Sequence, residues 1–127
     1  MRVYMLTAKQ IKDAKENLVL KFPAHYEHDD CIRIAYEWLD AQKKTKNPRN
    51  VPHDLKHLIT RWASRYVSRS DVEVAAYMHP DIIGDYPYYN ISSRLTEPNI
   101  KRLVNIDQSN SQDQIIMHQS TDYKMKE

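Results

Sequence analysis

The sequence predicts an all-α fold of five or six short helices, and three observations point to it. The 127 residues include a single glycine, Gly84, whereas the turns of hairpin-rich β proteins commonly need several. Apolar residues recur at the three- and four-residue spacing of amphipathic helices. The chain is also long enough for one domain with its own core. We expect a helical domain at residues 1–106 and a flexible polar tail at residues 107–127.

The N-terminal half predicts two helices. Thr7, with Gln10 three residues later, is a capping-box signal for a first helix that ends near Lys21. Asp29 or Asp30 can cap a second helix that runs to about Lys43. Its apolar residues cover two faces of the helix, so we expect the helix to be buried on both sides. These residues are Cys31, Ile32, Ile34, Ala35, Tyr36, Trp38 and Leu39.

The C-terminal half predicts shorter helices. Pro52 suits the first turn of a third helix. The apolar stripe of that helix comprises Leu55, Leu58, Ile59, Trp62 and Tyr66. We expect Leu58, Ile59 and Trp62 to pack against Trp38 and Leu39. Ser70 with Glu73 precedes a brief fourth helix. Asn90 can cap a fifth helix over residues 91–96, and Pro98 opens a last helical turn. From residue 107 onward the sequence is polar and lacks a clear period, which predicts a mobile tail.

Positive charge is concentrated in one stretch. Residues 43–69 contain eight Lys or Arg and one acid, a local charge of +7 in a chain whose net charge is +2. A basic stretch of this density is typical of proteins that contact a phosphate backbone. Residues 52–94 also follow the order of a helix-turn-helix unit, although the loop at residues 79–89 exceeds the usual turn of about three to four residues.

Duplex DNA is therefore the first partner that the sequence suggests. Asn90, Ser92, Ser93 and Arg94 would lie on the recognition helix, where Asn and Arg side chains can bond adenine and guanine. The phosphate contacts would be Lys56, Arg61, Arg65, Arg69, Lys101 and Arg102. This hypothesis requires Arg61, Arg65, Arg69 and Arg94 to share one exposed face. The alternative is a helical bundle with a solvated basic face and no nucleic acid.

A loop rich in tyrosine offers a second candidate surface. Tyr86, Tyr88 and Tyr89 lie close to two prolines and the single glycine. Exposed tyrosines provide rigid contact area with a polar tip, which suits a protein interface. In the alternative interpretation, the rings fold back onto the core and fix the loop. An exposed loop would favour a protein partner, and a homodimer is compatible with it.

The sequence favours neither a metal site nor an enzyme. His53 and His57 are four residues apart, and His25, His28 and Cys31 are spaced by three, but no second ligand pair accompanies either set. Signatures of nucleophilic hydrolases are absent. We therefore expect no cofactor and no catalytic residue. The lone cysteine and the lack of long apolar stretches predict a cytoplasmic protein with no membrane association.

Two runs of the sequence resemble small accessory proteins carried by enterobacterial phages and prophages. The runs are FPAHYEHDDCIRIAYEWLDAQKK and RYVSRSDVEVAAYMHPDIIGDYPYYNISSRL, and the resemblance extends over about residues 5–106. It implies a compact protein that regulates phage genes or disables a host factor. The leading hypothesis is a DNA-binding regulator with an atypical helix-turn-helix. The alternative is a non-enzymatic protein-binding factor, such as a phage inhibitor of a host enzyme.

Overall fold

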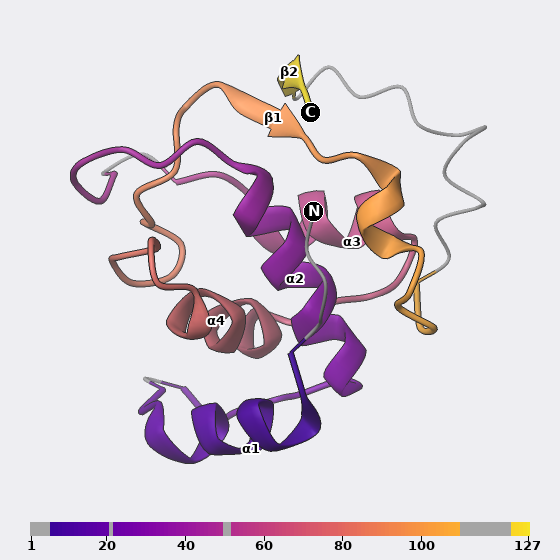
Figure 1. Cartoon of the computed structure of the whole chain (residues 1–127). Helices are drawn as coiled ribbons and strands as arrows, with labels where there is room; N and C mark the ends of the chain where they lie inside the picture. The colour runs from indigo at the N-terminus through magenta and orange to yellow at the C-terminus, as the bar shows by residue number, and fades with distance from the viewer. Residues whose placement is uncertain (1–5, 21, 50–51, 110–122) are drawn as a thin grey trace.

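The computed structural model describes residues 6–20, 22–49, 52–109 and 123–127, which form a mostly helical fold (Figure 1). The elements are α1 (Ala8–Asn17), α2 (Asp29–Ala41), α3 (Leu55–Ala63), α4 (Arg69–Met78), β1 (Leu95–Glu97), the 3-10 helix η1 (Ile100–Leu103) and β2 (Tyr123–Lys126). The helical prediction is confirmed, but these residues contain four α-helices rather than five or six. A small parallel sheet of β1 and β2 means that the fold is not all-α.

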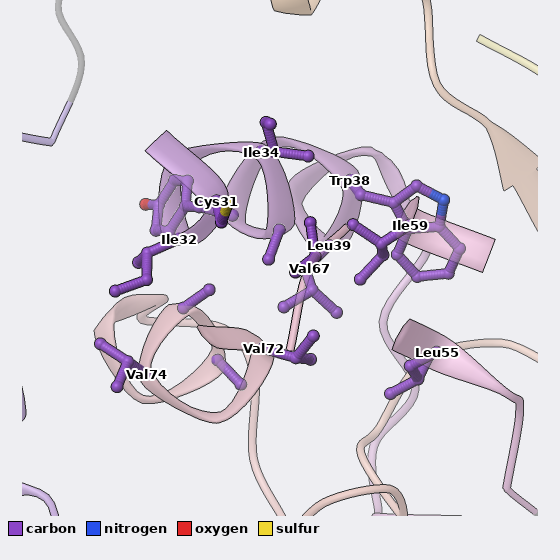
Figure 2. Close-up of a cluster of buried hydrophobic side chains, with 14 of the residues drawn as sticks. Cys31, Ile32, Ile34, Trp38, Leu39, Leu55, Ile59, Val67, Val72 and Val74 are labelled. Atoms are coloured by element: carbon purple, nitrogen blue, oxygen red, sulfur yellow. The ribbon is translucent and has the colours of Figure 1, made fainter. Parts of the chain in front are cut away.

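Helix α2 is the centre of the core. It packs most extensively against α4 and also contacts α1, α3 and η1. Figure 2 shows Ile32, Leu39 and Val72 among the side chains that fill the space between α2 and its neighbours. The five residues predicted to form the core centre are all buried, which confirms the expectation from helical periodicity: Trp38, Leu39, Leu58, Ile59 and Trp62.

Capping hydrogen bonds are found where helices begin, although several helices begin or end at other residues than predicted. The capping box of Thr7 and Gln10 forms as predicted, but α1 ends at Asn17, before Lys21. His28 caps α2, because its Nδ1 accepts the backbone N–H of Asp30 at 3.0 Å. Helix α3 begins at Leu55, three residues after the expected Pro52, and it ends before Tyr66.

Helix α4 begins earlier than predicted because a buried acid completes its cap. Ser68 Oγ accepts the backbone N–H of Asp71 at 3.2 Å, and the Asp71 carboxylate accepts the backbone N–H of Ser68 at 3.0 Å. Asp71 also accepts the backbone N–H of Glu27 at 3.3 Å, so the cap ties α4 to the connector before α2. The predicted pair of Ser70 and Glu73 lies inside the helix instead.

The predicted fifth helix does not form. Asn90 is buried, and its side chain bonds three backbone groups: it accepts from Ile83 N at 2.7 Å and donates to Thr45 O and Asp81 O at 3.0 Å each. The Asn90 amide therefore joins the 79–89 loop to the connector after α2 instead of capping a helix. An isolated antiparallel bridge between Lys44 and Ile91 continues that contact, and the chain then extends into β1.

The C-terminal residues 123–127 are docked, contrary to the prediction of a mobile tail there. Strand β2 pairs in parallel with β1, with Leu95 opposite Tyr123. The buried indole of Trp38 donates its Nε1–H to Tyr123 Oη at 2.9 Å. Residues 110–122 of the predicted tail lie outside the described residues.

The contact between Glu127 and Arg102 should make the docking of β2 pH-dependent. Hydrogen bonds from Arg102 hold the pKa of Glu127 below its ordinary value. A lowered pKa in the folded state means that the stabilisation is complete above the unfolded value and disappears as the pH falls through the folded value. We expect Glu127→Gln to lower the melting temperature at neutral pH, with a difference from wild type that shrinks on acidification. Parallel melting curves from pH 3 to 7 measure it, and a difference that stays constant with pH would contradict the assignment.

Candidate functional site

The basic residues predicted to contact phosphate are partly neutralised in space. Arg65 lies 3.5 Å from the carboxylate of Glu27, and its Nη1 donates to Tyr66 O at 3.0 Å. Arg69 donates its Nε–H to Glu73 at 2.9 Å. Both acids lie outside residues 43–69, so the local charge of +7 counted along the sequence overstates the charge that this surface presents.

Arg102 is bonded to more carboxylates than Arg65 or Arg69. Its Nη1 donates to Glu37 at 2.8 Å and to Asp40 at 3.0 Å, and its Nε donates to Glu127 at 2.6 Å. These bonds raise the pKa of Arg102, so the guanidinium stays charged. A side chain that already bonds three carboxylates serves as a structural cation joining α2, η1 and the C-terminal strand.

The remaining residues of the DNA hypothesis lie on non-helical backbone or at exposed positions. Arg61, Ser93, Arg94 and Lys101 are exposed, and Lys56 is half-buried at the start of α3. Ser92 accepts the backbone N–H of Arg94 through its Oγ at 3.1 Å. Since residues 90–94 are not helical, the structure gives the proposed base-reading residues no recognition helix, and contact between these residues and DNA stays a prediction.

Two of the three tyrosine rings of the 79–89 loop fold back onto the core. Tyr89 is buried and packs edge-on against the half-buried Tyr86, with ring centroids 6.2 Å apart. Burial raises the pKa of both phenols, and at Tyr86 a hydrogen bond from the backbone of Lys56 partly offsets this effect. Tyr88 alone remains exposed. Gly84 makes the turn possible with a φ of 107°, because a Cβ there would lie 2.6 Å from Tyr88 O.

Two adjacent hollows lie beside α4, and together they form what we call the groove. The first hollow has a volume of about 270 Å³ and the second about 200 Å³. Arg69 and Glu73 line both, so the two hollows meet at this pair, which we call the wall. The first is also lined by Leu18, Val19, Ala76, Tyr77, Ile82, Gly84, Asp85, Tyr86 and Tyr89. The second is also lined by Phe22, Pro23, His25, Lys56, Tyr66, Ser68 and Ser70.

Exposed apolar side chains surround this groove. Val19 is 91% exposed, Phe22 60%, Tyr77 52% and Tyr66 47%. Single exposed apolar residues are ordinary, but several that border the same hollows form a surface suited to binding. The Arg69 guanidinium lies 4.7 Å from the Phe22 ring centroid and 5.0 Å from that of Tyr86, which holds the wall in place. The groove can therefore accept apolar side chains without disturbing the Arg69–Glu73 pair.

Sequence reasoning missed most of this groove. It assigned Tyr66 to the buried stripe of the third helix, whereas α3 ends at Ala63 and Ser64 adopts a left-handed φ of 51°. Phe22 and Val19 belong to a connector that shows no helical period. The available signal was the nearly continuous apolar run of Leu18, Val19, Leu20 and Phe22, which one face of an amphipathic helix cannot bury.

The histidines form structural bonds instead of a ligand cluster. His57 lies 2.6 Å from Asp54, and His53 lies 3.3 Å from Ser92 O. In the part of the chain that the structure describes, no three His, Cys, Asp or Glu side chains are arranged to hold a metal ion. The buried His79 is 2.8 Å from Asp40 through Nε2, and its Nδ1 accepts the backbone N–H of Asp81, so both ring nitrogens are occupied.

In the same described ranges, no helix has the length and apolar character needed to cross a bilayer.

Cys31 should be unreactive in the folded protein. The thiol is buried and donates to Tyr66 O at 3.4 Å, and burial raises its pKa to about 11. The thiolate is the reactive form, so alkylation at pH 8 should be slow until the protein unfolds. Labelling with iodoacetamide in the presence and absence of denaturant measures this difference, and equal rates would place the thiol at the surface.

The chain was compared with known proteins at three levels. No protein-family model, curated protein or solved structure matches it.

Proposed function

We propose that the protein is a non-enzymatic protein-binding factor and that a polypeptide partner docks in the groove beside α4. The observation that supports this proposal is the gathering of Val19, Phe22, Tyr66 and Tyr77 around two adjoining hollows. Aromatic side chains at the edge of a concave surface are typical of the residues that dominate binding energy at protein interfaces.

The charge arrangement of the groove supports a protein partner over a nucleic acid. Arg69 is already bonded to Glu73, and Asp85 offsets Lys56, the one further Lys or Arg in the lining. A phosphate backbone would have to compete with these carboxylates for the cation, at a cost in Coulomb energy. A polypeptide can present apolar groups to the hollows without disturbing the Arg69–Glu73 pair.

Duplex DNA is the second candidate, and a different set of residues favours it. Lys43, Lys46, Arg61, Arg94 and Lys101 are exposed. Without a recognition helix, such binding would rest on phosphate contacts and would weaken steeply with salt. None of these five side chains lines the groove, so variants can separate the two candidates.

To test the proposal, binders are selected from a library of random displayed peptides on the immobilised protein. The affinity of each selected peptide is then measured for wild type and for a groove variant. The test variant is Val19→Ser with Tyr77→Ser, since both side chains are exposed and line the first hollow. Loss of two apolar contacts should weaken selected peptides about 10- to 100-fold. The matched control is Val104→Ser, an exposed apolar residue outside the groove. Selected peptides that bind the double variant as tightly as wild type would refute the proposal.

A further inference from the structure

The two hollows differ in charge. Asp85 lines the first hollow and not the second, whereas Lys56 lines the second and not the first. The Arg69–Glu73 pair, common to both, adds no net charge. The first hollow is therefore negative and the second positive, and both have apolar edges.

We propose that the groove selects an extended peptide with two apolar side chains, an acidic residue beside Lys56 and a basic residue beside Asp85. This inference rests on the function proposed above and adds the chemistry and the direction of the bound segment. Each hollow receives one apolar side chain, because the Arg69–Glu73 wall separates them. Side chains two residues apart on an extended strand point to the same side, which suits adjacent hollows.

Contacts among its own lining residues hold the groove in one arrangement. Arg69 lies between the rings of Phe22 and Tyr86 and is bonded to Glu73. The Tyr86 ring also packs edge-on against the buried Tyr89, which holds the 79–89 loop against the core. A preformed groove loses little conformational entropy on binding, so charge placement at its ends can decide which peptide binds.

The experiment compares the peptides selected by wild type with those selected by two charge-inverted variants. Lys56→Glu should change the preference from acidic to basic at one end of the peptide only. Asp85→Lys should reverse the preference at the other end only. Each exposed charge pair should change peptide affinity about two- to fivefold. Lys56 lies in the first turn of α3, where an acid is favoured by the helix dipole, so this variant should fold. Lys101→Glu, outside the groove, is the matched control and should leave both preferences unchanged.

The outcomes separate this inference from the proposed function. Peptides that depend on Val19 and Tyr77 but keep their charge preference in both inverted variants would overturn the inference and leave the protein-binding function standing. A lack of any groove-dependent peptide would overturn both. If wild type dimerises and the Val19→Ser, Tyr77→Ser variant is monomeric by sedimentation, the occupant is a second copy of the chain, and the peptide assignment is wrong.

Discussion

Replacing Trp38 with alanine should lower the free energy of unfolding by about 3–5 kcal/mol, the usual cost of removing a fully buried large aromatic side chain. Trp38 is 0% exposed on the central helix α2. Its indole also donates to Tyr123 Oη at 2.9 Å, so the substitution removes the anchor of the C-terminal strand together with a large part of the core. Chemical denaturation followed by circular dichroism measures the effect.

Phenylalanine at the same position separates packing from hydrogen bonding. Trp38→Phe removes the bond to Tyr123 and some ring volume while keeping an aromatic group in place. Trp62→Phe is the matched control, because the buried Trp62 Nε1 has no hydrogen-bond partner among the described residues. We expect Trp38→Phe to cost about 0.5–1.5 kcal/mol more than Trp62→Phe. Equal losses would mean that the Tyr123 contact contributes nothing to stability.

Replacing Arg102 with alanine should destabilise the protein by about 2–4 kcal/mol, because it leaves the buried Glu37 carboxylate without its guanidinium partner. The loss should be smaller than for a fully buried pair, since Asp40 and Glu127 are partly exposed and can be hydrated. It should also be smaller at acidic pH, where a carboxyl that has lost the guanidinium can take up a proton. Thermal melting at pH 4 and pH 7 provides the measurement.

The neighbouring Lys101 offers the control for this substitution. Lys101→Ala removes one positive charge from the same 3-10 helix, but its side chain is exposed. Its effect should be within a few tenths of a kcal/mol. If Arg102→Ala were equally mild, the network of Arg102 with Glu37, Asp40 and Glu127 would not hold the C-terminal strand in place.

The helical core was predictable because periodicity and capping are local signals. Trp38, Leu39, Leu58, Ile59 and Trp62 follow the helical spacing, and all are buried. The extended segment after Asn90 was not predictable in this way, because the Asn90 side chain bonds the backbone of Thr45, 45 residues earlier, together with Asp81 and Ile83 in the preceding loop. Strand β2 is too short to show a pattern, and it forms through contacts with Trp38 and Arg102.

The candidate site was less predictable than the fold. A basic stretch in the sequence identifies cations but not the acids that approach them in space, such as Glu27 beside Arg65. Two of the three predicted loop tyrosines, Tyr86 and Tyr89, line the first hollow. The rest of the groove comes from Val19, Phe22 and Tyr66, whose exposure depends on where α1 and α3 end.

Amide NMR of the protein titrated with a selected peptide locates the binding surface, which we assign to the groove beside α4. We predict that the shifts concentrate at groove residues such as Val19, Tyr66 and Tyr77, and that they disappear in the Val19→Ser, Tyr77→Ser variant. Shifts confined instead to the exposed basic residues Arg61, Arg94 and Lys101 would contradict the account.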